Sequence, residues 1–405
     1  MPDHAEPAAR PVRHFMLSQS CSTLAYQMLV VAFGWQVYEL SHSVLFLGLI
    51  GLAQFAPQLL LTLIVGHTAD QFERRRIAQY AQGQQALGAT LLALACLSQQ
   101  QSLTLIFACA VLTGSARAFE SPSMQSLLPT LASETQLPRS LAMAASARQS
   151  AVIIGPALGG MIFALGAAAV YGSCLLIWLL AMSWLQVLPP GRQSRAKEPM
   201  SLRSALAGVQ FIRARPVIFG AISLDLFSVL LGGATALLPV YARDILHTGP
   251  WGLGLLRTAP AIGALATSLY LARHPLRRHI GRNMAWAVIL FGLSTIVFGL
   301  SHVFPLSLAA LVVLGASDMV SVVIRSSLVQ LETPDAMRGR VSAVNFIFIG
   351  TSNQLGEFES GITAAWFGTV PAVVLGGVGT LIVVALWRRW FPALFERDTF
   401  AGPAK

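Results

Sequence analysis

The chain has 405 residues, of which 55% are hydrophobic and 11% are charged, and 27 Lys and Arg against 17 Asp and Glu give a net charge of +10. Soluble domains carry about 25% charged residues, so this composition excludes a conventional soluble enzyme. A membrane-spanning helix needs about 20 apolar residues. The length therefore accommodates about twelve spans joined by short connections.

Apolar stretches bounded by polar or Gly/Pro turns fall into two sets of six. They predict helices, because a chain in lipid must satisfy its backbone hydrogen bonds internally. The first set covers residues 15–39, 43–66, 77–97, 102–123, 140–165 and 167–188. The second set covers residues 216–242, 251–272, 284–302, 304–326, 341–366 and 368–391. We expect an all-α membrane protein with twelve transmembrane helices in two pseudo-symmetric six-helix halves, residues 15–188 and 216–391.

Three polar segments separate or flank these halves: an N-terminal tail (1–14), a linker (189–215) and a C-terminal tail (392–405). The linker begins with Pro189-Pro190-Gly191, which stops a helix, and then predicts a short amphipathic helix on the inner membrane face. The two tails, the even-numbered connections and the inner end of the last span hold 22 of the 27 Lys and Arg, whereas the odd-numbered connections hold only Arg243. This asymmetry predicts a bacterial inner-membrane protein with both termini in the cytoplasm. The basic charge is thus a topology signal, and we expect no nucleic-acid partner.

The two halves match each other in sequence. At a shift of 203 residues Ala56-Pro57 aligns with Ala259-Pro260, and at a shift of 201 Gly155 aligns with Gly356. The aligned positions preserve loop charges, a mid-helix proline and spaced glycines. Two repeated halves with a site between them are typical of secondary transporters.

The connection after the second span contains Gly66, Asp70, Arg74 and Arg75, and it resembles the signature loop of the major facilitator superfamily. Physically, such a loop can form a charged gate that closes the cytoplasmic side. The alternative is a positive-inside anchor with an incidental aspartate. Residues 116–122 and 334–341 resemble the branch of that superfamily that contains the enterobactin (siderophore) exporter and related bacterial drug exporters. The resemblance extends from about residue 15 to 391.

The resemblance implies roles for further residues. Glu120 is expected to accept from Arg74 or Arg75, while Asp70 faces the start of the eleventh helix near Arg340; Arg117 is either part of this gate or a snorkelling interface residue. In the fifth span, a group of glycines around a proline resembles the kinked helix of superfamily antiporters, with an ordinary Gly-rich packing face as the alternative. That group consists of Gly155, Pro156, Gly159 and Gly160.

Charged residues inside the spans supply the candidate transport site. Each costs about 2.5–3.5 kcal/mol at a helix centre, and burial favours the neutral form of a carboxylic acid, which is what proton coupling requires. The candidates for proton coupling or the substrate cavity are Asp225, Asp318, Glu357, Glu359, Arg148 and Arg257. Glu357 and Glu359 point about 200° apart on a helix, so both cannot face one cavity. The arginines either pair with the acids or hold an anionic substrate, and a static ion pair is the alternative for each charge.

The expected function follows from the resemblance and from these charges. We expect a monomeric exporter that exchanges protons for a small amphipathic molecule, with a siderophore as the leading substrate and a drug or other hydrophobic compound as the alternative. A membrane sensor that does not transport and a membrane-embedded enzyme are candidates from different functional classes. The sequence offers no catalytic constellation, no phosphate-binding glycine loop with a lysine and no metal-ligand spacing. We therefore expect no enzymatic activity, cofactor or metal; the partners are the substrate, protons and the lipid bilayer.

Overall fold

The computed structural model describes residues 10–133, 135–189 and 202–400, without the side chains of residues 62–71, 202–205, 335–336, 343 and 346–347. The described chain is helical and contains no strand. It divides into two compact units: the first unit comprises residues 1–41 and 53–199, and the second unit comprises residues 42–52 and 200–405. Each unit is described by itself.

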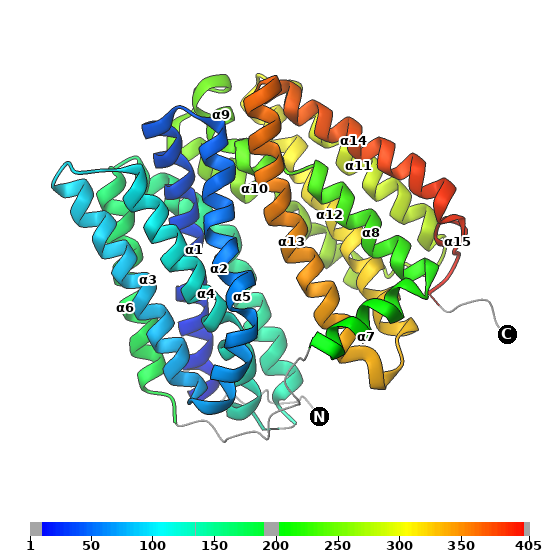
Figure 1. Cartoon of the computed structure of the whole chain (residues 1–405), viewed down its shortest axis with the longest axis horizontal. Helices are drawn as coiled ribbons and strands as arrows, with labels where there is room; N and C mark the ends of the chain where they lie inside the picture. The colour runs from blue at the N-terminus through cyan, green and yellow to red at the C-terminus, as the bar shows by residue number, and fades with distance from the viewer. Residues whose placement is uncertain (1–9, 134, 190–201, 401–405) are drawn as a thin grey trace. The chain divides into compact units, whose positions relative to one another are not determined.

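The first half of the chain forms long helices that coincide with the first six expected spans (Figure 1). Their bounds are α1 Arg10–Ser41, α2 Val44–Gln71, α3 Arg74–Leu97, α4 Leu103–Leu131, α5 Leu137–Phe163 and α6 Ala167–Gln186. In the first unit, α1 packs along α5 and α6, and α3 packs along α4 and α6. The helix α1 begins before the predicted residue 15, because Val12 and Phe15 are buried against α3, α4 and α6.

The second half begins with the linker helix α7 and continues with the helices of the remaining spans. The bounds are α7 Leu202–Arg213, α8 Pro216–Leu231, η1 Ala234–Leu237, α9 Leu238–Val240, η2 Tyr241–Ile245, α10 Gly249–Arg273, α11 Ile280–Leu300, α12 Phe304–Glu332, α13 Asp335–Phe367, α14 Thr369–Trp390 and α15 Pro392–Phe395. In the second unit, α10 and α11 both pack on α12, α11 also packs on α14, and α8 packs on α13 and α14. This arrangement is consistent with the expected twelve spans.

Nine helical segments within the described ranges are long and apolar enough to cross a membrane. The helices α1, α3 and α13 do not belong to this set because they carry more polar side chains, among them Ser22 on α1, Gln82 on α3 and Glu357 on α13. Polar groups at membrane depth are tolerated where they face protein or water. Each of these three side chains belongs to one of the polar clusters described below.

The expected seventh span, residues 216–242, is not one continuous helix. The helix α8 ends at Gly232-Gly233, and η1, α9 and η2 continue the path as short helical turns. A Cβ atom on Gly232 would lie 2.5 Å from the ring of Phe291, and one on Gly233 would lie 2.5 Å from the carbonyl oxygen of Gly356. Residues Pro216–Ile245 are nevertheless one of the segments long and apolar enough to cross a membrane, so the predicted span is present. Its helix is broken inside because the Gly-Gly pair allows a break where α11 and α13 approach, a feature that hydropathy does not register.

The linker and the C-terminal segment both pack on the second unit. The predicted linker helix is present as α7, which lies against α13 (Figure 1). The segment after α15 contacts the cytoplasmic ends predicted for α11 and α12: Arg397 Nη2 lies 2.6 Å from Glu332 Oε1, and His279 Nδ1 lies 2.9 Å from Asp398 Oδ1. The expected C-terminal tail is thus packed on helices as far as residue 400.

The crossing of α10 and α12 depends on glycines that allow close backbone approach. A Cβ atom on Gly315 would lie 1.9 Å from the carbonyl oxygen of Pro260, and one on Gly263 would lie 1.9 Å from that of Val312. Gly315→Ala is therefore expected to lower the free energy of unfolding by about 1–3 kcal/mol, the usual cost of overpacking. Thermal unfolding in detergent checks this. Gly172→Ala on α6 is the control, because no atom lies within 4 Å of its added Cβ; equal stability of both variants would contradict the prediction.

Candidate functional site

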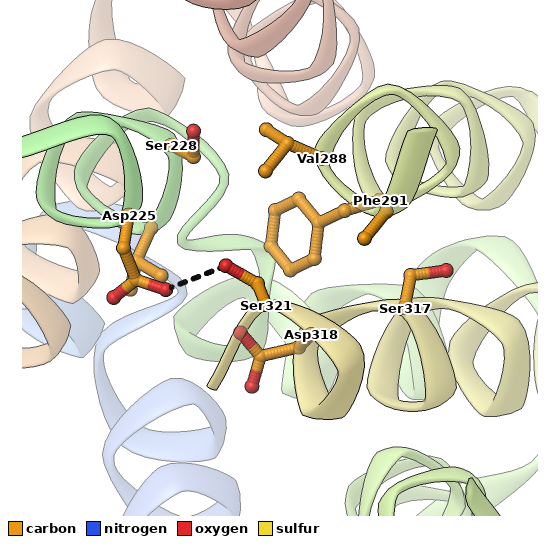
Figure 2. A pocket seen from close by; sticks show the side chains of 9 residues that line it. Asp225, Ser228, Val288, Phe291, Ser317, Asp318 and Ser321 are labelled. Atoms are coloured by element: carbon orange, nitrogen blue, oxygen red, sulfur yellow. Dashed lines mark hydrogen bonds between the residues drawn. The ribbon is translucent and has the colours of Figure 1, made fainter. Parts of the chain in front are cut away.

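Asp225 and Arg325 form a buried ion pair between α8 and α12. Arg325 Nη1 lies 2.6 Å from Asp225 Oδ2, and the side chains of Arg325 and Asp225 are 2% and 6% exposed, respectively. The hydroxyl of Ser321 donates to Asp225 Oδ1 at 3.3 Å (Figure 2). Asp225 is a predicted site residue, whereas Arg325, a basic residue near the inner end of the tenth predicted span, is not among the predicted site residues. The spacing of Asp318, Ser321 and Arg325 by three and four residues could have revealed it, because such residues share one face of a helix.

Asp318 brings a second carboxylate to this ion pair. It interacts electrostatically with both Asp225 and Arg325, but it makes no direct hydrogen bond or ion pair with any described residue. Asp225 and Asp318 line one small pocket with a cavity volume of about 10 Å³ (Figure 2). The other polar residues of the lining are Ser228, Ser317 and Ser321. Two carboxylates therefore interact electrostatically with one guanidinium group, which forms its ion pair with Asp225, beside a pocket lined with hydroxyls. We call Asp225, Asp318 and Arg325 the aspartate–arginine triad.

Glu357 lies in another part of the second unit and has its own arginine. It projects from α13, interacts electrostatically with Arg257 of α10 and accepts a hydrogen bond from Thr235 in η1. A Cβ atom on Gly51 would lie 2.8 Å from Glu357 Oε2, so this carboxylate also packs against the first turns of α2. Of the two predicted roles of Arg257, the structure favours pairing with an acid. The broken seventh span is tied to α13 through this group.

Glu359 and Arg148 belong to neither group. Glu359 accepts a hydrogen bond of 2.6 Å from Thr363 one turn further along α13, so the two glutamates have separate partners, as their angular separation predicts. The side chain of Arg148 on α5 is exposed. It forms no ion pair or hydrogen bond with the described part of the chain. Of its two predicted roles, pairing with an acid is therefore not observed there.

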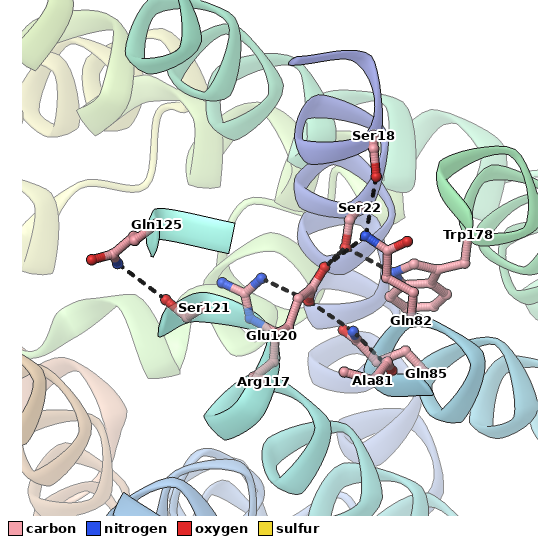
Figure 3. Close-up of polar contacts among 10 residues, drawn as sticks. All are labelled: Ser18, Ser22, Ala81, Gln82, Gln85, Arg117, Glu120, Ser121, Gln125 and Trp178. Carbon is pink, nitrogen blue, oxygen red and sulfur yellow. Dashed lines mark hydrogen bonds and ion pairs between the residues drawn. The ribbon is translucent and has the colours of Figure 1, made fainter. Parts of the chain in front are cut away.

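Glu120 is the centre of a polar cluster in the first unit, and its side chain is 3% exposed. Gln85 and Gln82 of α3 donate to its carboxylate at 2.9 and 3.1 Å, and Ser22 of α1 also donates to it. Arg117, one turn earlier on α4, lies 3.4 Å from Glu120 Oε2 (Figure 3). The carboxylate is thus held by three neutral donors and by one guanidinium group.

The predicted partnership of Glu120 with Arg74 or Arg75 is wrong in this structure. Arg74 donates to the carbonyl oxygen of Ser126 at 3.1 Å, and Arg75 forms an ion pair with Glu73 at 3.0 Å. The physical reason is position along α3: the glutamines that bind Glu120 lie 8 and 11 residues after Arg74, or about 12 and 16 Å further along the helix. Glu120 therefore meets the middle of α3 and not its basic start.

The other predicted gate residues remain a prediction. Gly66 and Asp70 fall in residues 62–71 of α2, outside the side chains that the structure describes. Arg340 is exposed in the first turns of α13, and its Nη1 lies 3.7 Å from the sulfur of Met337.

The glycines of the fifth span pack against α1. A Cβ atom on Gly159 would lie 2.8 Å from the Cα atom of Met28, and Gly155, Pro156 and Gly160 are buried within the uninterrupted helix α5. The structure thus supports the packing interpretation of this motif. Its predicted role in antiport stays a prediction.

The two polar clusters occupy matching places in the repeat. The shift of 203 residues pairs Ser22 with Asp225, and the shift of 201 pairs Glu120 with Ser321. In the first unit the hydroxyl of Ser22 donates to the carboxylate of Glu120, and in the second unit the hydroxyl of Ser321 donates to the carboxylate of Asp225. Each half therefore has one hydrogen bond between a serine and a carboxylate, and it joins equivalent helices: α1 with α4 in the first unit and α8 with α12 in the second. The serine lies on the first helix of the pair in the first unit and on the second helix in the second unit. Applying the repeat to Ser22 and Glu120 would have predicted the contact in the second unit.

Removing the Glu120 carboxylate is expected to destabilise the first unit strongly. Glu120→Ala leaves Arg117 and three amide or hydroxyl donors without their acceptor, so we expect a loss of about 3 kcal/mol in the free energy of unfolding. Glu120→Gln keeps the size and one acceptor and should cost less. Denaturation in detergent checks the order, with Gln125→Ala as an exposed control on the same helix, expected within about 0.5 kcal/mol of the wild type. A stable Glu120→Ala variant would contradict the structural role of this cluster.

Comparisons with known proteins agree with this architecture. The chain is 27% identical to the enterobactin exporter EntS of Citrobacter koseri over 93% of this chain and 90% of that protein, and 26% identical to EntS of Shigella boydii over 94% and 91%. Two solved structures share the fold: a bacterial homologue of the human lysosomal transporter Spinster (TM-score 0.74, 12% identity, 97% and 98% covered) and a bacterial homologue of the iron transporter ferroportin (TM-score 0.71, 16% identity, 97% and 100% covered). The sequence model of the Major Facilitator Superfamily matches residues 15–357. The all-α membrane fold is thereby confirmed, and the chain belongs to the Major Facilitator Superfamily, as a multi-pass membrane transporter.

Proposed function

We infer that this protein is a proton-coupled exporter of a small amphipathic molecule, with a siderophore as its leading substrate. The proposal of proton coupling rests on one observation, the aspartate–arginine triad. With both carboxylates ionised the triad has a net charge of −1, and one proton makes it neutral. A buried cluster with net charge is costly, whereas the neutral cluster is not. Binding and release of one proton is therefore the natural chemistry of this cluster.

Two other pairs of charged groups in the membrane lack this property. Glu120 with Arg117, an ion pair, and Glu357 with Arg257, which interact electrostatically, are each neutral in sum, so they need no proton to remain in the membrane. Glu120 has in addition three neutral donors that stabilise its ionised form. We therefore assign proton coupling to the triad and not to these two pairs.

Protonation of the triad would act on the contact between α8 and α12. A proton on Asp225 removes the charge that holds Arg325 at 2.6 Å, and Arg325 is then left to Asp318 on its own helix. The helix α8 ends at Leu231, six residues after Asp225. Protonation would thus weaken the contact between α8 and α12 close to the break of the seventh span. At such a break, a change of helix direction needs little backbone rearrangement.

The direction of transport and the substrate rest on the relatives. The relatives named enterobactin exporter match over almost the whole chain at 26–27% identity. We therefore propose export across the bacterial inner membrane, with both termini in the cytoplasm. The gate formed by Asp70, Arg74, Arg75 and Arg340 is part of the same proposal. Glu120 and Arg117 do not contact the basic residues of that loop, so the proposed gate does not include Glu120.

Siderophore partitioning tests the substrate. Deletion and complemented strains are grown without iron, and siderophore in cells and medium is quantified by mass spectrometry. Retention in the deletion strain that the wild-type gene relieves supports siderophore export. Unchanged secretion in a strain without other exporters contradicts it, and efflux of toxic hydrophobic compounds becomes the function to test next.

A further inference from the structure

Charges inside the spans are distributed unequally between the two units. Among the described residues of the first unit, the span interiors hold Arg117 and Arg148 against a single acid, Glu120. The interiors of the second unit hold four acids and two arginines. The acids are Asp225, Asp318, Glu357 and Glu359, and the arginines are Arg257 and Arg325. The first unit therefore has an excess of one positive charge, and the second unit has an excess of two negative charges.

Arg117 is the arginine of the first unit whose guanidinium group lies over an aromatic ring. Its guanidinium carbon lies 4.4 Å from the centre of the Tyr26 ring on α1, and its side chain is 25% exposed in the middle of α4. Of its donors, only Nη1 is engaged by a described residue, at 3.4 Å from Glu120. A guanidinium group on an aromatic face is positioned by the ring while its edge stays available for paired N–H···O bonds to an anion.

Glu120 does not compensate Arg117 fully. Its carboxylate accepts shorter hydrogen bonds from Gln85 and Gln82 at 2.9 and 3.1 Å and a further bond from Ser22. The contact with Arg117 is the longest of the set, so Glu120 acts mainly to orient the guanidinium group. Arg148 adds a second cation on α5, a helix that packs along the same α1 that carries Tyr26, and no described residue pairs with it.

We propose that Arg117 and Tyr26, assisted by the charge of Arg148, bind a planar organic anion such as an aromatic carboxylate or phenolate. The carboxylate or phenolate oxygen takes the free edge of Arg117, and the ring of the ligand lies beside Tyr26. The inference rests on the proposed export function and deepens it: the first unit recognises the substrate anion, while the carboxylates of the second unit carry the proton. The cations that bind the anion and the carboxylates that bind the proton would thus belong to different units of the protein.

Equilibrium dialysis with radiolabelled salicylate and with salicylamide tests the site on the purified full-length protein. The two probes share ring and hydroxyl and differ in the charge of one group. The wild type should prefer salicylate. Arg117→Ala should weaken salicylate binding about tenfold or more, the effect of one lost charge-assisted hydrogen bond, and leave salicylamide unchanged. Arg148→Ala should weaken salicylate severalfold, and Arg139→Ala, an exposed arginine at the start of the same helix, should bind like the wild type.

Arg117→Lys decides the matter if the alanine variant does not fold. It keeps the charge and loses the planar fork, so it should retain the preference for salicylate over salicylamide with reduced affinity. Wild-type protein that binds both probes equally overturns the inference, as does a folded Arg117→Ala variant with unchanged salicylate binding or with equal losses for both probes. The assay uses no proton gradient, so a failure of the proposed coupling does not affect its outcome.

Discussion

Asp225→Asn is expected to abolish proton-coupled efflux while the protein still folds and inserts. The substitution leaves Asp318 and Arg325 as a neutral pair in place of the triad, so the cluster no longer has a reason to take up a proton. The loss of packing is small, because asparagine has the shape of aspartate and can still accept from Ser321, which lies 3.3 Å away. Efflux should therefore fall to the level of cells without the protein, at normal membrane levels.

Asp318→Asn is an independent test of the triad. It leaves Asp225 and Arg325 as a neutral pair, so it should also abolish coupling. Asp244→Asn is the matched control, because Asp244 is 47% exposed in the connection after the seventh span and is expected to have no role in coupling. Efflux driven by protons at wild-type rates in either triad variant would remove the triad from the mechanism.

Arg325→Met is expected to have the largest effect on stability. Arg325 is 2% exposed and its partner carboxylate 6%, so the variant leaves the buried Asp225 and the half-buried Asp318 without a cation. Breaking a buried ion pair from one side costs about 3–5 kcal/mol, because the remaining charge has no compensation. The free energy of unfolding measured in detergent should fall by this amount, and the midpoint of thermal unfolding should fall with it.

A second substitution separates this electrostatic cost from lost packing. In the double variant Asp225→Asn with Arg325→Met, one of the stranded carboxylates is gone, so the loss should be clearly smaller than in Arg325→Met alone. Transport should remain absent, because the triad is not restored. A double variant as unstable as the single one would show that the arginine contributes packing and not charge compensation.

Much of the fold could be predicted because a membrane helix needs an apolar stretch of sufficient length, which is visible in the sequence. The apolar stretches mark the long helices, the Pro-Pro-Gly sequence marks the linker, and the spacing of Leu202–Arg213 marks its amphipathic helix. The break after Leu231 could not be seen this way, since an apolar Gly-Gly pair counts as membrane-compatible. The packed C-terminal segment was also missed, because its contacts are ion pairs such as Arg397 with Glu332 that join residues 65 positions apart.

The candidate site was predictable as a set of charges but not as a set of pairs. The free-energy cost of placing a charged side chain in lipid is enough to identify Asp225, Asp318 and Glu357 from the sequence alone. Which arginine meets which acid depends on helix packing, so the partnerships of Asp225 with Arg325 and of Glu357 with Arg257 required coordinates. The predicted pairing of Glu120 with the basic loop was wrong because resemblance supplied the residues but not their positions along α3.

The most direct measurement of proton-coupled export uses inside-out membrane vesicles with an acidic interior. The compound that the deletion strain retains is added outside, and its accumulation is followed by mass spectrometry. Coupling through the triad predicts accumulation against the concentration gradient that stops when nigericin collapses the pH difference and that is absent with Asp225→Asn. Accumulation that survives nigericin, or that proceeds equally well with Asp225→Asn, would contradict proton-coupled export through the triad.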